Sequence, residues 1–173
     1  MANRAYLYAS DRSDDWDHGE KEYYDSRWAI PLAWFFLYEP ADVRLIDVYR
    51  QGSHWQEAKL WAEKATAVAR FVRRGRMLLS LIGGRLPKEA VGEFVAKVEE
   101  RPGRNLLMDP AEVLGGGGGT EAEHAANFVR ILTAIGDGDA HGETVRALAQ
   151  FYVGEFDADP ARFECQILGV TYW

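Results

Sequence analysis

Short segments with the pattern of extended strands lie at both ends of this 173-residue chain. Residues 3–9 alternate, so that Tyr6 and Tyr8 share one face of a strand and smaller apolar residues share the other. Residues 163–172 are rich in Phe, Ile, Val and Tyr, which predicts a closing strand. Because helical patterns dominate between them, we expect an α+β fold with a small mixed sheet that includes the N- and C-terminal strands.

The middle of the chain predicts about five helices that pack on this sheet. We expect a short buried helix over residues 30–38, followed by longer ones at residues 53–74, 87–101, 120–136 and 143–153. Strands are predicted at residues 43–49 and 105–108, and residues 77–82 fit a strand or a helix. No repeat is found, and 173 residues suit one domain, so we expect a single α+β domain over residues 1–173.

The prediction of a helix over residues 53–74 depends on two observations. Ser53 and Gln56 have the spacing of a capping box. Ala58, Trp61 and the residues that follow at steps of three and four form one apolar stripe, and Gly75 is placed to end the helix.

Charge and cysteine content indicate the compartment and exclude some partners. The net charge is −7, which disfavours general binding to nucleic acid. Cys165 is the only cysteine, so no disulfide forms within the chain, and this suits a reducing compartment. We expect a cytoplasmic protein without a signal peptide or a membrane span. Aromatic residues make up 13% of the chain, which argues against disorder.

Motifs for cofactors, metals or catalysis are weak. The glycine run at residues 115–119 precedes a helix, but the Lys of a phosphate-binding loop is missing, and we expect a flexible loop. Residues 137–142 begin like a calcium loop, yet Leu148 stands where the loop needs its glutamate. Ser80 lacks the glycines of a nucleophile elbow. We therefore expect no cofactor and no metal, and find no catalytic motif.

The candidate binding site is an acidic loop near residues 10–26. Carboxylates lie there beside aromatic rings, a composition that suits the contact with a basic protein surface. A solvated loop is the alternative. The candidate partner-binding residues are Asp14, Asp15, Trp16, Asp17, His18, Glu20, Tyr23 and Tyr24.

One basic cluster breaks the acidic character of the chain. Arg70, Arg73 and Arg74 share a face of the predicted helix, with Arg76 nearby. A solvated helix end and a contact with an anion or RNA both fit this pattern.

Three segments of the sequence resemble a bacterial family of small uncharacterised proteins. They are residues 3–8 (NRAYLY), 30–32 (IPL) and 168–173 (LGVTYW). Families of this kind resemble the immunity proteins that neutralise polymorphic or type VI secreted toxins. The resemblance implies a cytosolic bacterial protein that holds another protein, and it supplies no catalytic residues.

Two classes of function remain open from the sequence. The first is a non-catalytic binding protein, in concrete terms an immunity protein that occludes the active site of a basic toxin. The second is a small enzyme or ligand-binding regulator, with a pocket between the sheet and the helix expected at residues 53–74. A scaffold or chaperone subunit is not separable from the first, and the sequence leaves the oligomeric state open.

Overall fold

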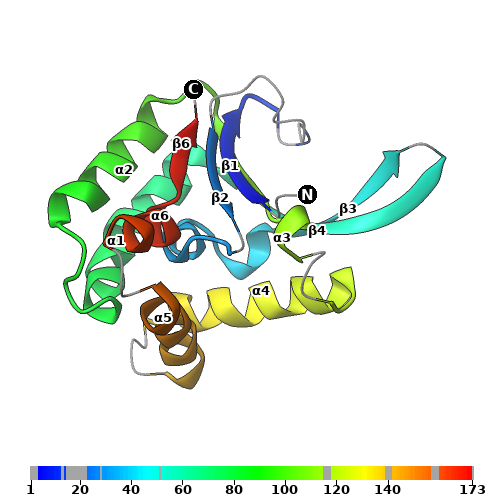
Figure 1. Ribbon diagram of the computed structural model, residues 1–173. Coiled ribbons are helices and arrows are strands. Elements are labelled where there is room, and N and C mark those ends of the chain that lie inside the picture. Colours follow the sequence, from blue (N-terminus) through cyan, green and yellow to red (C-terminus); the bar gives the residue numbers. More distant parts are fainter. Residues whose placement is uncertain are drawn as a thin grey trace.

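One antiparallel sheet organises the chain (Figure 1). The computed structural model describes residues 4–12, 14, 23–27, 29–50, 52–114, 118–138, 142–156 and 160–172. The strand order is β3-β4-β5-β1-β2-β6. The strands are β1 (Arg4–Ser10), β2 (Tyr23–Arg27), β3 (Val43–Arg50), β4 (Ser53–Glu63), β5 (Asn105–Asp109) and β6 (Val170–Tyr172).

The α+β class predicted from the sequence is confirmed, and strands from both chain ends share the sheet. Every described strand pair is antiparallel, so the expected mixed pairing is not found. β1 lies inside the sheet, between β5 and β2, whereas β6 lies at one edge and β3 at the other.

Helices pack on one face of this sheet, which we call the helix-covered face (Figure 1). The 3₁₀ helices are η1 (Leu32–Leu37) and η2 (Pro40–Asp42); the α-helices are α1 (Lys64–Leu81), α2 (Lys88–Glu100), α3 (Ala111–Leu114), α4 (Glu121–Gly136), α5 (Glu143–Phe156) and α6 (Pro160–Leu168). None of the helices in the described part of the chain combines the length and the apolar character that a membrane crossing requires.

The main core lies between the helix-covered face and the helices. η1 is at its centre, because all of its residues are buried, including Trp34 and Phe36. Leu7 of β1 and Leu60 of β4 join the same core from the sheet. The opposite face, which we call the second face, carries a smaller cluster that contains Tyr6 and Tyr8. The two faces of β1 therefore divide as the sequence predicted.

Helix boundaries agree with local sequence in several places. The capping box of Thr120 and Glu123 begins α4, with the Glu123 N–H donating to the Thr120 hydroxyl at 3.3 Å. Pro87 is the N-cap of α2, which ends before Pro102, as expected. The short buried helix after Pro31 is η1, and α5 begins at Glu143 as predicted.

The helix expected over residues 53–74 is wrong in its first half. Residues 53–63 form β4, and α1 begins only at Lys64. Ala58, Leu60 and Ala62 alternate onto the helix-covered face, and this burial outweighs the helix propensity of the segment. Gly75 does not end the helix, because α1 continues to Leu81 and takes in most of the undecided segment 77–82.

The closing strand predicted over residues 163–172 is largely a helix. α6 runs to Leu168, and only Val170–Tyr172 forms a strand, β6. Phe163 and Ile167 are four residues apart and both buried, which is the spacing of one helical face.

The basic cluster has a structural role. Arg70 contacts Asp42 at 2.6 Å and Glu39 at 3.0 Å, and Arg74 donates to the carbonyl of Tyr38 at 2.8 Å. These residues lie inside α1 and not at its end, so the expectation of a solvated helix end is wrong. Arg70 and Arg74 therefore hold η2 against α1, whereas Arg73 and Arg76 are exposed.

Candidate functional site

The predicted acidic site is only partly within the described residues. Asp14 is exposed and pairs with exposed Arg12 at 3.1 Å. Asp15, Trp16, Asp17, His18 and Glu20 lie outside the described residues. Tyr23 is the first residue of β2, opposite Tyr8 of β1, so the loop is shorter than predicted.

Tyr24 does not belong to an exposed aromatic surface. Its side chain is buried at 3% exposure on the helix-covered face. The Tyr24 ring packs against Phe94 of α2 with centroids 5.2 Å apart, and the Arg101 guanidinium lies 4.7 Å from its centroid. Tyr24 is therefore not part of an exposed loop, because β2 turns this ring into the core; its role in partner binding stays a prediction.

Charged side chains are buried on the second face of the sheet. Lys59 of β4 is 3% exposed and contacts Asp109 at 2.5 Å and Glu57 at 2.9 Å. Asp25 is 1% exposed and pairs with Arg4. Buried charges are tolerated where opposite charges and hydrogen bonds compensate them. The buried charges on the second face therefore compensate one another through ion pairs.

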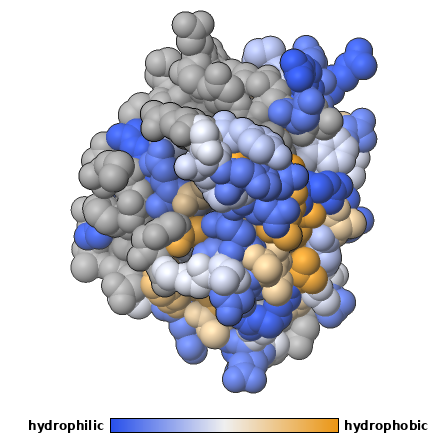
Figure 2. Space-filling view, turned by 90° about the vertical axis from the view of Figure 1, so that its right-hand side faces the viewer, coloured by the Kyte–Doolittle hydropathy of each residue, from blue (hydrophilic) through white to orange (hydrophobic). Residues whose placement is uncertain are grey.

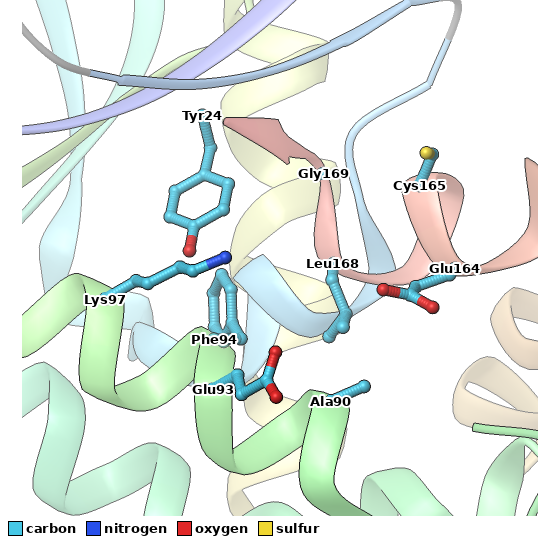
Figure 3. A pocket seen from close by; sticks show the side chains of 9 residues that line it. All are labelled: Tyr24, Ala90, Glu93, Phe94, Lys97, Glu164, Cys165, Leu168 and Gly169. Carbon is cyan, nitrogen blue, oxygen red and sulfur yellow. The ribbon is translucent and has the colours of Figure 1, made fainter. Parts of the chain in front are cut away.

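A cavity of about 240 Å³ lies where α2, α6 and β2 meet. We call it the α2–α6 cavity, and Figure 3 shows the side chains around it. Its apolar part includes Phe94 of α2 and Leu168 of α6. The lining residues are Tyr24, Ala90, Glu93, Phe94, Lys97, Glu164, Cys165, Leu168 and Gly169.

The charged groups of the cavity come from two helices. Glu93 and Lys97 project from the exposed side of α2, and Glu164 projects from α6. In Figure 3 the Glu93 and Glu164 carboxylates lie on either side of Leu168, and the Lys97 ammonium lies toward the Tyr24 hydroxyl. The cavity thus combines an apolar wall with two carboxylates and one cation.

A close approach of Gly169 to Trp34 fixes one wall of this cavity. Gly169 has φ +87°, and a Cβ at this position would lie 2.8 Å from Cζ2 of Trp34. The Trp34 indole N–H donates to the carbonyl of Leu168 at 2.9 Å. Only glycine fits this approach and this backbone conformation, so the turn from α6 into β6 is set by the buried indole.

Among the described residues, the other candidate sites predicted from the sequence have no side chains placed to bind a ligand. Near Gly118 and Gly119, the Glu123 carboxylate accepts from the Thr120 N–H at 2.7 Å, which places negative charge where a phosphate would bind. Residues 115–117 and 139–141 lie outside the described residues. Within the described ranges no three potential metal-ligating side chains come together. Cys165 lies on α6 and not in a strand.

Sequence reasoning missed the cavity for a definite reason. The pocket was predicted beside a helix at residues 53–74, and the first part of that segment, residues 53–63, is β4. Glu93 and Lys97 lie four residues apart on a correctly predicted helix, so the sequence places them on one helical face. Glu164 was assigned to a strand, although it lies on α6, so it was not placed with them. No family model, no curated protein and no solved structure matches the chain.

Proposed function

We propose that this chain is a non-catalytic protein-binding protein that takes a basic side chain of its partner into the α2–α6 cavity. The observation that supports the proposal is the pairing of two carboxylates, Glu93 and Glu164, with the apolar wall of Phe94 and Leu168. Lys and Arg have an apolar stem and a cationic head, so this lining is complementary to both parts. Aromatic and Arg anchors seated in pockets contribute most of the affinity of many interfaces.

The size of the cavity favours one side chain over a large ligand. Its volume is about 240 Å³. Pockets for drug-sized molecules and cofactors are larger, at roughly 300–1,000 Å³. A water molecule takes about 30 Å³ in the liquid, so an extended side chain with a few waters fills a space of this size.

The surface around the cavity is acidic. Glu89 and Glu93 are exposed on α2, and Glu164 is exposed on α6. The Lys97 ammonium lies toward the Tyr24 hydroxyl (Figure 3), so a cation from the partner can approach the Glu93 carboxylate. With a net charge of −7, the chain as a whole also attracts a basic surface and speeds its association.

In this proposal the partner is a toxin, and the chain is an immunity protein that covers the toxin's active site. A toxin that acts on nucleic acid carries a basic surface around that site, because its substrate is a polyanion. An acidic protein competes for the same surface. In this proposal the loop that contains Asp14, Asp15 and Asp17 is the surface that attracts the partner during the first encounter.

The test is an affinity pull-down from the protein's own cells at low and moderate salt, with mass spectrometry of the bound material. The parent is compared with Glu93→Gln/Glu164→Gln and with the control Glu99→Gln/Glu100→Gln. The control changes charge by the same amount on exposed residues that do not line the cavity. We expect one stoichiometric basic partner that binds the parent and the control and is lost from the cavity variant.

Other outcomes contradict separate parts of the proposal. Equal capture by all three proteins would remove the cavity as the anchor and leave a binding protein that uses another surface. Neutralising Asp14, Asp15 and Asp17 to Asn should slow association at low salt; unchanged rates would exclude this loop from steering. If no partner binds at either salt concentration, the protein-binding proposal fails and a search for a small ligand replaces it.

A further inference from the structure

The β3–β4 hairpin projects from the body of the protein as a two-stranded arm (Figure 1). β4 pairs with β5 only from Leu60 to Glu63, so the part of the arm before Leu60 extends past β5. β3 is the first strand of the sheet, and no other described strand lies along its outer edge. An edge strand of this kind is a template for pairing with another strand.

One hydrogen bond shows which backbone groups of β3 point outward. Ala58 lies directly opposite Leu45, and its N–H donates to the Glu121 carboxylate of α4 at 2.7 Å. Opposite residues of an antiparallel pair either bond to each other or both point away. The N–H and C=O of Leu45 therefore point to the outer edge, and those of Asp47 and Tyr49 do so as well, because the pattern repeats every two residues.

Apolar and aromatic side chains are exposed along this edge. Leu45 is 42% exposed and Tyr49 is 74% exposed. The Tyr49 ring stacks on His54 of β4 with centroids 4.4 Å apart. Figure 2 looks onto the side from which the arm projects and shows hydrophobic residues in view among hydrophilic ones.

We infer that the outer edge of β3 pairs antiparallel with β3 of a second copy of this chain, about a two-fold axis at Ile46. Such an axis is perpendicular to the sheet and keeps the same face of both copies on one side. Each residue must then pair with a residue of the same parity, odd with odd and even with even. Only a few registers satisfy this condition.

Charge selects among these registers. An axis at Asp47 places this carboxylate directly opposite its own copy, and hydrogen bonds from Gln56 and His54 lower the pKa of Asp47, which keeps it ionised. An axis at Leu45 avoids this contact but pairs a shorter part of the strand. An axis at Ile46 pairs residues 43–49 of both copies and sets no like charges opposite each other.

The register at Ile46 also matches the outward backbone groups. Leu45 faces Asp47 of the second copy, and Val43 faces Tyr49 of the second copy. The outward groups of Leu45 and Asp47 can exchange about four main-chain hydrogen bonds across the axis. The Val43 N–H already donates to the Pro40 carbonyl, and the Val43 carbonyl accepts from the Arg44 guanidinium at 2.9 Å. Val43 and Tyr49 would also cover part of each other's exposed surface. In this register the strand opposes no like charges and matches its own outward hydrogen-bonding groups, which is why the occupant is a second copy.

The test uses sedimentation velocity of the full chain over a wide range of concentration. The parent is expected to show a monomer–dimer equilibrium. Leu45→Lys and Leu45→Glu are compared, since both lose the same exposed apolar contact. In the inferred register residue 45 faces Asp47, so the lysine gains two opposite-charge contacts per dimer and the glutamate meets two like charges. We expect the dimer Kd of Leu45→Glu to be roughly tenfold or more above that of Leu45→Lys.

Each alternative gives a different result. A parent that stays monomeric at every concentration overturns the inference. Equal Kd values for the two variants also overturn it, because an axis at Leu45 would oppose like charges in both. Leu45→Glu/Asp47→Lys exchanges the charges and should restore the dimer; failure to do so contradicts the register.

The inference is independent of the proposed function. Glu93→Gln/Glu164→Gln leaves β3 unchanged, so the cavity variant should dimerise like the parent. A cavity variant that loses its partner but still dimerises, and a Leu45→Glu variant that becomes monomeric but still binds the partner, would show two separate surfaces.

Discussion

Replacing Gly169 by alanine tests the wall of the α2–α6 cavity. The new Cβ would lie 2.8 Å from Cζ2 of Trp34 and 3.3 Å from the carbonyl oxygen of Asp25. Trp34 has little freedom to move, since it is fully buried and its indole N–H bonds to Leu168. Gly169 also has φ +87°, where side chains are strained.

The magnitude has two parts. The left-handed backbone costs roughly 1–2 kcal/mol for a residue with a Cβ. Overpacking against a fixed indole adds about 1–3 kcal/mol. We therefore expect Gly169→Ala to lower the free energy of unfolding by about 2–5 kcal/mol, with a fall in Tm of about 2–4 °C for each kcal/mol in a chain of this size.

A second glycine separates the two parts. Gly83 has φ +63°, and no atom lies within 4 Å of the place that a Cβ would take, so Gly83→Ala measures the backbone cost alone, about 1–2 kcal/mol. The measurement is urea unfolding followed by circular dichroism for both variants. If their losses agree within about 0.5 kcal/mol, the contact with Trp34 is not a constraint. In a Trp34→Phe background, Gly169→Ala should cost little more than Gly83→Ala.

Two further predictions concern a buried phenol pair and a helix cap. Burial raises the pKa of Tyr38 and of Tyr152. Their unfolded forms ionise from about pH 10, so the free energy of unfolding should fall as pH rises above 10, and each Tyr→Phe variant should reduce this fall. At pH 7, Tyr152→Phe loses the hydrogen bond to the Ile30 carbonyl and should lower the free energy of unfolding by about 1 kcal/mol. The Tyr38 hydroxyl has no described hydrogen-bond partner, so Tyr38→Phe should leave the free energy of unfolding unchanged. A larger loss in Tyr38→Phe than in Tyr152→Phe would contradict this argument. Thr120→Ala removes the cap of α4 and should cost about 1 kcal/mol by chemical unfolding, with Thr120→Ser as the control that retains it.

Local sequence predicted the elements whose cause is local. The capping box of Thr120 and Glu123, and the alternation around Tyr6 and Tyr8, appear in the structure as expected. β4 was missed because Ala, Gln, Glu, Lys and Leu favour helices in isolation. Tertiary contacts make this segment a strand. β3 and β5 pair with it on its two sides, and Asp109 of β5 compensates the charge of the buried Lys59.

The candidate site depends on contacts that the sequence does not display. Nothing in the order of residues shows that Glu164 of α6 comes beside Glu93 of α2, since this follows from how the two helices pack around Tyr24. Gly169 was visible as a glycine between two apolar segments. That it approaches a tryptophan 135 residues away is a property of the tertiary structure (169 − 34 = 135).

The position of β1 inside the sheet has a consequence for how the chain is made. β1 leaves the ribosome before both of its neighbours. β2 follows soon after it, but β5, where Asp109 pairs with Tyr6, comes about a hundred residues later. Until β5 is synthesised, one side of β1 has no strand to pair with. Folds that depend on such distant pairings form slowly, on a scale of roughly milliseconds to seconds. A nascent chain that stalls before residue 105 would therefore present an unsatisfied strand to chaperones or to other nascent chains.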